Sequence, residues 1–327
     1  MAIDVFGMCN ALFDIVAEVE DDDLRRLGVQ KGGMFLIDQD RREALVGLVG
    51  DRLLTTAAGG SGANTMLGLT QLGATTCYTS RVGPDDFGRR YRESLEGFGV
   101  KANLGVGAGA TGISVILITP DRERTMNTYL GESRALTAAD VDLDDLRRSR
   151  CLYVTGYLWD TENQKEAVLL ALREARAVGA LVTFSLSDPF CVGRHRDDFR
   201  TLLRNHVDVV FANGEEARAM AEAETVEESA RYLAGLCGTA VVTQDRTGSL
   251  VHRGDEVTRI PAYAVKAVDA TGAGDMYAAG YLYGVVRGLD PAAAGRIASW
   301  CAAQVVANLG PRLPAIDHQA MRSATGA

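Results

Sequence analysis

The C-terminal half of the chain alternates short apolar segments with longer amphipathic ones, and this alternation strongly constrains the fold. Strands are predicted at 152–155, 181–186, 207–211 and 240–243, and helices at 162–178, 197–205, 215–222 and 225–236. Strands that are separated by helices pair in parallel, because each helix returns the chain to the same end of the sheet. The sequence therefore predicts an α/β fold with helices on both faces of a central, mostly parallel sheet.

The N-terminal half follows a different pattern and predicts a second, smaller sheet. Strands are expected at 3–8, 15–20, 113–118 and 124–130, the last two as a hairpin. We expect a single domain over residues 1–327, with a small β-sheet lid formed by the separate segments 14–38 and 102–131. The last long helix is expected from Pro291 to about Asn308, and the tail after Asp317 is expected to be loose.

The residues 268–275 (Val-Asp-Ala-Thr-Gly-Ala-Gly-Asp) form a Gly-rich turn between a strand predicted at 259–265 and a helix beginning near Met276. Such a turn leaves backbone N–H groups without partners, and the helix dipole makes them an anion site. Asp275 would lie in the first turn, which usually keeps a carboxylate ionised. A carboxylate beside a phosphate site suits the removal of a proton from an attacking hydroxyl. The simpler alternative is an acid that stabilises the helix N-terminus.

Other polar groups also follow predicted strands. Asp14 comes just after the first strand, and a second Gly-rich turn at 59–64 (Gly-Gly-Ser-Gly-Ala-Asn) opens a helix with Asn64 in its first turn. The segments 213–216 (Asn-Gly-Glu-Glu) and 243–246 (Thr-Gln-Asp-Arg) each follow a strand. Ligands of α/β sheets bind where parallel strands end, so we expect these groups to gather. Each has an ordinary alternative: a helix-start hydrogen bonder for Asn64, a turn residue for Asp14 and a plain helix start for 213–216.

Charge and composition exclude several classes of protein. The net charge of −9, without a basic cluster, argues against a nucleic-acid-binding protein. No apolar run approaches the roughly 20 residues that span a bilayer, so no membrane partner is expected. The six cysteines are scattered, which favours reduced, mostly buried thiols in the cytoplasm. The chain begins with a predicted strand rather than a signal peptide.

Several familiar motifs fail on their context. Residues 107–112 fit G-x-G-x-x-G but lead into the predicted strand at 113–118, whereas a dinucleotide-binding loop opens a helix. Asp-Phe-Gly at 86–88 and His-Arg-Asp at 195–197 copy protein-kinase motifs in reversed order. The P-loop pattern G-x-x-x-x-G-K-[ST] does not occur, which excludes a P-loop ATPase.

Four motifs remain, in a fixed order along the chain. They are Gly59-Gly60 with Asn64, Val82-Gly83-x-Asp85-x-x-Gly88, Asn213-x-x-Glu216 and Asp269-x-Thr271-Gly272-Ala273-Gly274-Asp275. From Asp14 to about Pro311, the chain resembles the PfkB (ribokinase-like) family of sugar and nucleoside kinases. It is most similar to the adenosine kinase branch, through Gly7-x-x-Asn10-x-Leu12-x-Asp14-Ile15, Ser185-Leu186-Ser187-x-Pro189-Phe190 and Thr243-Gln244-x-Arg246. Ala270 and Asp245 depart from the family pattern, which often has Thr and Gly there.

The resemblance implies an ATP- and Mg²⁺-dependent phosphotransferase with an alcohol acceptor, built as a ribokinase-like three-layer α/β/α sandwich with a small β-sheet lid. Asp275 would be the general base, and the N–H groups of Gly272, Ala273 and Gly274 would hold the transferred phosphoryl charge. The residues implied in acceptor binding are Asn10, Asp14, Gly60, Ser61 and Asn64. Those implied in ATP binding are Asn213, Thr243, Gln244, Arg246, Thr271, Gly272 and Gly274. Glu216 would hold Mg²⁺ through water.

The favoured reaction is transfer of the γ-phosphoryl group of ATP to the 5′-hydroxyl of adenosine, in purine salvage. The apolar residues that could cover a purine, or equally belong to the core, are Leu12, Phe13, Met34 and Leu36. Arg124 could reach the phosphates when the lid closes, or equally be an exposed turn residue. A sugar kinase acting on ribose or fructose, an inosine or guanosine kinase, and a binding protein without catalysis are the alternatives. The resemblance also allows a site for a monovalent cation such as K⁺ near Asp269 and Gly310. It is compatible with a monomer or a homodimer.

Overall fold

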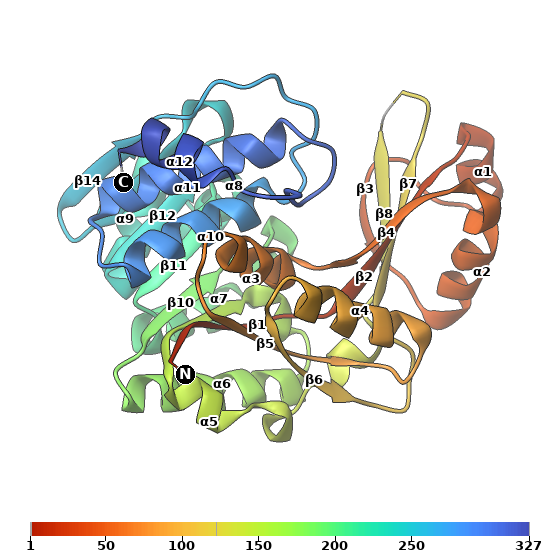
Figure 1. Cartoon of the computed structure of the whole chain (residues 1–327), viewed down its shortest axis with the longest axis horizontal. Helices are drawn as coiled ribbons and strands as arrows, with labels where there is room; N and C mark the ends of the chain where they lie inside the picture. Colours follow the sequence, from red (N-terminus) through yellow and green to blue (C-terminus); the bar gives the residue numbers. More distant parts are fainter. Residues whose placement is uncertain (1, 122, 327) are drawn as a thin grey trace.

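A large, mostly parallel sheet forms the centre of the molecule (Figure 1). The computed structural model describes residues 2–121 and 123–326, with the backbone alone at Asp51. The strand order is β14-β13-β12-β11-β10-β9-β1-β5-β6. The bounds are β1 Ile3–Met8, β5 Thr76–Val82, β6 Lys101–Val106, β9 Ser149–Thr155, β10 Leu181–Ser185, β11 Val209–Asn213, β12 Thr239–Thr243, β13 Ser249–Arg253 and β14 Glu256–Ile260. The neighbouring strands β12, β11, β10, β9, β1, β5 and β6 pair in parallel. Strands β13 and β14 extend the sheet as antiparallel strands.

Helices cover both faces of this sheet. The helices of the chain are α1 Asp21–Arg26, α2 Gln39–Val49, α3 Ser61–Gln71, α4 Asp86–Gly97, α5 Leu143–Arg147, α6 Glu162–Ala177, α7 Pro189–His206, α8 Gly214–Ala221, α9 Val226–Cys237, α10 Ala273–Val286, α11 Pro291–Val306 and α12 His318–Thr325. Of these, α1 and α2 lie beside a second sheet rather than on the large one (Figure 1). Successive side chains of a strand point to opposite faces, so each strand contributes to two cores. In β9, Cys151 and Tyr153 pack with α3, α10 and α11, whereas Leu152 and Val154 pack with α6, α7 and α9. The predicted three-layer α/β/α sandwich is thus confirmed.

A second sheet has the order β3-β8-β7-β2-β4 and lies to the right in Figure 1. Its bounds are β2 Leu12–Glu18, β3 Gly33–Leu36, β4 Leu53–Gly59, β7 Ile113–Ile118 and β8 Arg124–Tyr129. The expected segment 102–131 begins too early, because β6 pairs with β5 in the large sheet. The expected segment 14–38 omits β4, which pairs with β2 and leads directly into the Gly-rich turn at 59–64.

Two expectations near the C-terminus were wrong. The strand expected at 259–265 ends at Ile260, because Pro261 has no N–H for a ladder and the chain leaves the sheet there. The tail after Asp317 is not loose but forms α12. Asp317 caps this helix by accepting a hydrogen bond from Ala320 N at 2.9 Å, and Met321 is buried.

Two further features bear on the expectations drawn from composition. The described helices include none that is long and apolar enough to cross a bilayer. All six cysteines are unpaired and buried, as predicted. Their thiols therefore contribute to the cores as small apolar groups.

The motif at 82–88 fixes the start of α4. The Asp85 carboxylate caps this helix by accepting from Gly88 N at 2.9 Å, and it also accepts from Thr111 N at 2.9 Å and Thr111 Oγ1 at 2.5 Å. A side chain at Gly83 would lie 2.3 Å from the carbonyl oxygen of Gly109. The motif therefore ties α4 to the loop that enters β7.

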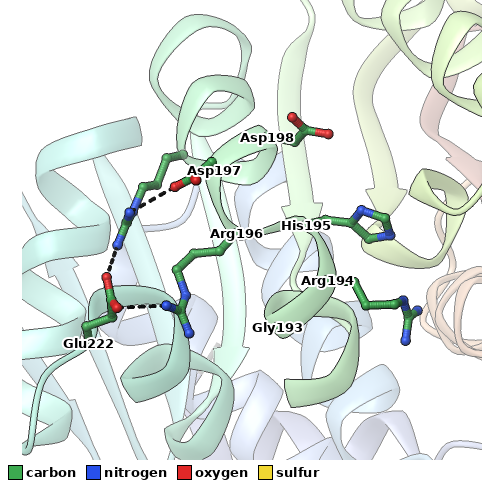
Figure 2. Close-up of a pocket in the computed structure, with 8 residues that line it drawn as sticks. Gly193, Arg194, His195, Arg196, Asp197, Asp198 and Glu222 are labelled. Atoms are coloured by element: carbon green, nitrogen blue, oxygen red, sulfur yellow. Dashed lines mark hydrogen bonds and ion pairs between the residues drawn. The ribbon is translucent and has the colours of Figure 1, made fainter.

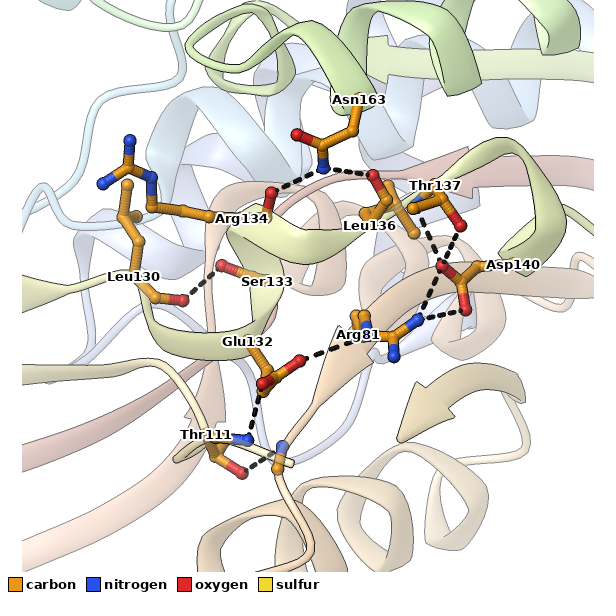
Figure 3. A network of polar contacts seen from close by, with 12 residues as sticks. Arg81, Thr111, Leu130, Glu132, Ser133, Arg134, Leu136, Thr137, Asp140 and Asn163 are labelled. Atoms are coloured by element: carbon orange, nitrogen blue, oxygen red, sulfur yellow. Dashed lines mark hydrogen bonds and ion pairs between the residues drawn. The ribbon is translucent and has the colours of Figure 1, made fainter. Parts of the chain in front are cut away.

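The G-x-G-x-x-G segment at 107–112 packs against a carboxylate. Gly109 N donates to Glu132 Oε1 at 2.6 Å, and a Cβ at Gly107 would lie 1.7 Å from Glu132 Oε2. Glu132 also pairs with Arg81, which binds Asp140 at 2.9 Å (Figure 3). These two glycines allow close packing against Glu132, and the segment enters a strand as predicted rather than opening a helix.

We expect Asp85→Ala to lower the free energy of unfolding by about 2 kcal/mol, because it removes a helix cap and leaves the buried Thr111 without its acceptor. Urea denaturation at neutral pH measures this. Asp86→Ala is the matched control, since the exposed Asp86 pairs with Arg89 on the helix surface. An equal loss in both variants would contradict the assignment.

Candidate active site

Asp275 lies where the two Gly-rich helix starts meet. It occupies the first turn of α10 and faces the first turn of α3. Ser61 Oγ donates to Asp275 Oδ1 at 2.5 Å, and Asn64 Nδ2 donates to Oδ2 at 2.9 Å. Ser61 and Asn64, expected to contact the acceptor, therefore orient both oxygens of the carboxylate. The turns at 59–64 and 271–275 form one site.

Three glycines at these turns have different surroundings. Gly60 has a φ of +87°, and a Cβ there would lie 2.8 Å from the carbonyl oxygen of Asn10. Gly272 has a φ of +77°, and a Cβ would lie 2.6 Å from Pro311. Both positions require glycine. A Cβ at Gly274 would meet open space, so this side of the turn is accessible to a ligand.

The N–H groups of the turn are not all free. Ala273 N, expected to hold phosphoryl charge, donates to the carbonyl oxygen of Ala270 at 3.2 Å. In the described part of the chain, the N–H groups of Gly272 and Gly274 have no acceptor. These two remain available for an anion, and Ala273 would first have to release its bond.

Burial raises the pKa of Asp275 above its ordinary value, while the hydrogen bonds from Ser61 and Asn64 and the charge of Arg312 lower it. The helix-start position had predicted an easily ionised carboxylate. Burial between α3 and α10 outweighs that local effect. A carboxylate with a raised pKa is a stronger base, which suits proton abstraction near neutral pH.

Asp14 lies on β2, against the end of β4. A Cβ at Gly59 would lie 2.1 Å from Asp14 Oδ2, so only glycine leaves room for this carboxylate. Burial raises the pKa of Asp14 to about 7; the charge of Arg312 lowers it and that of Asp275 raises it. Asp14 and Asp275 are therefore coupled electrostatically, and the charge of Arg312 lowers the pKa of both.

Arg312 is the main site residue that the sequence analysis missed. It lies in the loop after α11, and its Nε donates to Asn64 Oδ1 at 3.0 Å. Burial lowers the pKa of Arg312, and the charges of Asp14 and Asp275 raise it. The only sequence signal was its place after Gly310-Pro311, which ends the last long helix. The local pattern does not reveal that this loop packs against the turn at 271–275.

Two of the predicted residues have side chains that make contacts within the protein. The side-chain amide of Asn10, expected to bind the acceptor, accepts from Gln164 Nε2 at 2.8 Å and donates to the carbonyl oxygen of Tyr157 at 3.3 Å. Its carbonyl oxygen and one of its two amide N–H groups are thus engaged within the protein. Phe13 is 2% exposed and packs against Phe87 with ring centroids 5.3 Å apart, so it belongs to the core rather than to a purine cover.

A cavity of about 100 Å³ lies beside Asp275, at the carboxyl ends of the central strands. The predicted residues that line it are Ser61, Asn213, Glu216, Thr243, Gly274 and Asp275. Tyr153, Ser185 and Tyr277 also line it and were not predicted. Ser185 belongs to the motif at 185–190 that carried the resemblance but was given no role, although it is the last residue of β10 as Asn213 and Thr243 are of β11 and β12.

Asn213 and Glu216 form a capping box at the start of α8. Asn213 Oδ1 accepts from Glu216 N at 2.8 Å, and Glu216 Oε2 accepts from Asn213 N at 3.0 Å. Asn213 Nδ2 also donates to Glu216 Oε1 at 2.7 Å. The helix-start alternative is confirmed for this pair, and both residues nevertheless border the cavity.

The electrostatics around Glu216 favour a cation. Burial raises its pKa to about 7; the N–H of Asn213 lowers it, and the charges of Asp188 and Asp275 raise it. The described residues hold no group of three or more His, Cys, Asp or Glu side chains that could bind a metal by themselves. A magnesium ion that keeps most of its waters fits such a site.

The segment after β12 forms a short turn at the cavity rim. Thr243 lines the cavity, Gln244 is half-buried and Arg246 is exposed. Asp245 has a φ of +47°, in the left-handed region that Asp tolerates better than most residues. Asp245 therefore adopts the left-handed conformation that glycine adopts freely at such a position.

Arg124 connects the small sheet to the Gly-rich turn. Its guanidinium binds Asp269 Oδ2 at 2.7 Å and Thr271 Oγ1 at 2.6 Å. Asp269 also accepts from Gly310 N at 2.7 Å. In this structure the guanidinium of Arg124 binds the Gly-rich turn and does not line the cavity. The described residues give no support to a monovalent-cation site here, because N–H and guanidinium donors already surround the carboxylate.

A larger pocket, of about 400 Å³, lies along α7 (Figure 2). Its described lining residues include none of those predicted for the site. Arg196 and Arg200 both pair with Glu222, at 2.7 and 2.5 Å, and Arg194 pairs with Asp160 at 3.0 Å. The His-Arg-Asp segment at 195–197 is therefore part of a surface ion-pair network.

Comparison with known proteins gives a consistent family signal. A family model described as pfkB family carbohydrate kinase matches residues 35–318. The crystal structure of adenosine kinase from Sinorhizobium meliloti superposes with a TM-score of 0.90 at 38% identity, covering 99% of this chain and 100% of that chain. That of a probable sugar kinase from Rhizobium etli CFN 42 superposes with a TM-score of 0.91 at 36% identity, covering 99% of both chains. A nucleoside kinase from Methanothermobacter thermautotrophicus is 29% identical over 259 residues, 77% of this chain and 79% of that protein.

The two glycines of the 271–275 turn should respond in opposite directions to alanine. Gly272→Ala forces a left-handed conformation and a clash with Pro311, so we expect it to lower the free energy of unfolding by about 2–4 kcal/mol. Gly274→Ala meets no neighbour and should raise it by up to about 1 kcal/mol, from helix propensity. Urea denaturation of both variants measures the difference, and equal effects would contradict the described turn.

Asp14→Asn should stabilise the ligand-free protein, increasingly so as the pH rises. The folded-state pKa is raised from 3.8 to about 7, so ionising Asp14 costs folding energy that grows between these two pH values. We expect the free energy of unfolding to rise by about 2–4 kcal/mol above pH 7 and to change almost not at all near pH 4. Urea denaturation across this range measures it, with the exposed Asp40→Asn as control. A gain independent of pH would contradict the burial of an ionisable Asp14.

Proposed function

Since the chain belongs to the pfkB family of carbohydrate kinases, we propose that it is an ATP-dependent kinase that phosphorylates the 5′-hydroxyl of adenosine. The observation that carries this proposal is the position of Asp275. Its carboxylate is held by Ser61 and Asn64 at the wall of a cavity that also reaches Asn213, Glu216 and Thr243. Phosphoryl transfer needs such positioning of the two reactants more than covalent chemistry.

In this proposal, Asp275 accepts the proton of the attacking hydroxyl. Because Ser61 and Asn64 each donate to one oxygen, the carboxylate is oriented before the acceptor arrives. The free N–H groups of Gly272 and Gly274 stabilise the charge that develops on the transferred phosphoryl group. Ala273 contributes only after its bond to Ala270 opens.

The nucleotide is proposed to lie along the strand ends on the other side of Asp275. Asn213, Thr243, Gln244 and Arg246 follow one another along this rim, with Thr271 at the Gly-rich turn. Mg²⁺, when bound with ATP, supplies charge neutralisation at the phosphates. Glu216 would hold it through water, because its carboxylate borders the cavity and is already engaged with Asn213.

The small sheet supports a nucleoside rather than a free sugar as acceptor. Residues paired across strands share one face, so the register links Val16 to Ile116, Met126 and Met34 on the face that carries Asp14. Met34 is exposed on this face, as is Leu36 two residues later. A purine base stacked on this apolar row would leave its ribose near Asp14.

The alternative is a sugar kinase acting on ribose or fructose, with inosine or guanosine as further acceptors. The 36% identity to the probable sugar kinase from Rhizobium etli supports the sugar-kinase alternative. The apolar row on the small sheet favours adenosine over a free sugar, because a free sugar has no apolar base to bury.

We further propose a cytoplasmic location and a role in purine salvage. The unpaired, buried cysteines favour a reducing compartment. The proposed partners are small molecules, ATP and a nucleoside.

The acceptor can be identified by measuring ADP release with ATP and Mg²⁺ against adenosine, inosine, guanosine, ribose and fructose. We expect adenosine to give the highest kcat/KM, because it presents both an apolar base and a 5′-hydroxyl. Turnover of free sugars alone would contradict the nucleoside assignment while leaving the family unchanged.

Asp275→Asn should lower kcat by about 10²–10⁴-fold, since the side chain keeps its size but loses its basicity. Adenosine should still bind, as measured by calorimetry. The exposed Glu215→Gln is a matched control at the same edge of the sheet. Undiminished turnover in the Asp275 variant would rule out its role as the general base.

A further inference from the structure

Arg312 is held firmly beside the acceptor side of the site. Gly310 N donates to Asp269 at 2.7 Å, and Gln71 Nε2 donates to the carbonyl oxygen of Leu313 at 2.7 Å. Pro311 fills the space that a side chain at Gly272 would need. A residue anchored on both sides loses little conformational freedom when it binds a ligand.

The guanidinium of Arg312 is incompletely used by the protein. Its Nε donates to Asn64 Oδ1 at 3.0 Å, but its Nη2 is buried without a hydrogen-bond partner among the described residues. Buried donors are almost always satisfied, and an unpaired donor on a charged group is costly. This orphaned donor therefore points to a ligand group that accepts a hydrogen bond.

The surrounding charges restrict what that group can be. Asp14 is the carboxylate whose charge acts most strongly on Arg312. A group lying between an acceptor and a donor must itself donate and accept, and a hydroxyl does both. Ribose carries two neighbouring hydroxyls besides its 5′-hydroxyl.

We propose that Arg312 Nη2 donates a hydrogen bond to a ribose hydroxyl of the acceptor, whose own proton is donated to Asp14. This assignment rests on the proposed function and deepens it. It makes Arg312 a specificity-determining residue that selects ribonucleosides over their deoxy analogues. Through Asn64, the same guanidinium couples ribose binding to the group that orients Asp275.

The test compares kcat/KM for adenosine, 2′-deoxyadenosine and 3′-deoxyadenosine in the wild type, Arg312→Met and Arg312→Lys. We expect the wild type to favour adenosine over one deoxy analogue by about 10- to 100-fold. Arg312→Met should bring this preference close to one. Arg287→Met, which removes an exposed arginine bound to the carbonyl oxygen of Gly73 at 2.9 Å, should keep it.

The two Arg312 variants separate charge from hydrogen-bonding geometry. Arg312→Lys keeps the charge but lacks the planar fork, so it should lose most of the preference. Arg312→Lys should keep the acid limb of the pH–kcat profile. Arg312→Met should move this limb to higher pH, because the positive charge of Arg312 lowers the pKa of Asp275. Should Arg312→Met fail to fold, Arg312→Lys supplies the same ratio.

Each outcome bears on a different statement. Arg312 variants that slow all three nucleosides equally, with the preference intact, would overturn the assignment, since a purely structural role acts on every substrate alike. A wild type that turns over adenosine with no preference would also overturn it, and the proposed function would stand. A wild type that is inactive on adenosine contradicts the proposed function and this assignment together.

Discussion

The hydrogen bonds from Ser61 and Asn64 to Asp275 are the contact on which the rest of the site depends. They join the first turns of α3 and α10, with Asn64 and Asp275 lying 211 positions apart in the chain. The two helices approach closely at Gly68, where a Cβ would lie 2.6 Å from Met276 Sδ. Because this packing is tight, the carboxylate cannot shift without moving a helix. In the proposed function, the acceptor and the nucleotide lie on opposite sides of this contact.

Electrostatic cost is concentrated at the same place. Burial raises the pKa of Asp14, Asp275 and Glu216, and the charge of Asp275 raises the pKa of the other two. Arg312 lowers the pKa of Asp14 and Asp275. A ligand-free protein that gathers carboxylates in this way is less stable than it could be, as is common where function sets the residue types. In the proposed function, the hydroxyl donors of the acceptor and a metal-bound phosphate relieve that cost.

Much of the architecture could be predicted from local patterns. The strand at 113–118 coincides with β7, and the α/β alternation gave the three layers, because apolar periodicity reports directly on which faces are buried. Errors arose where long-range pairing decides. The helix expected at 197–205 is present as the part of α7 after a kink at His195, and only the part before the kink, which begins after the cap at Asp188, was not expected. The strand β4 was missed because only its pairing with β2 makes it a strand.

The sequence by itself determined the class of fold, the two Gly-rich helix starts and the residue types at the strand ends. These follow from turn chemistry and side-chain periodicity, which act over a few residues. The tertiary structure decided that Ser61 and Asn64 orient Asp275, that Asn10 and Phe13 are buried, and that Arg312 contacts Asn64. It also reversed the expected shift in the pKa of Asp275. Burial and charge at a point depend on every segment that packs there, and no local stretch of sequence contains that information.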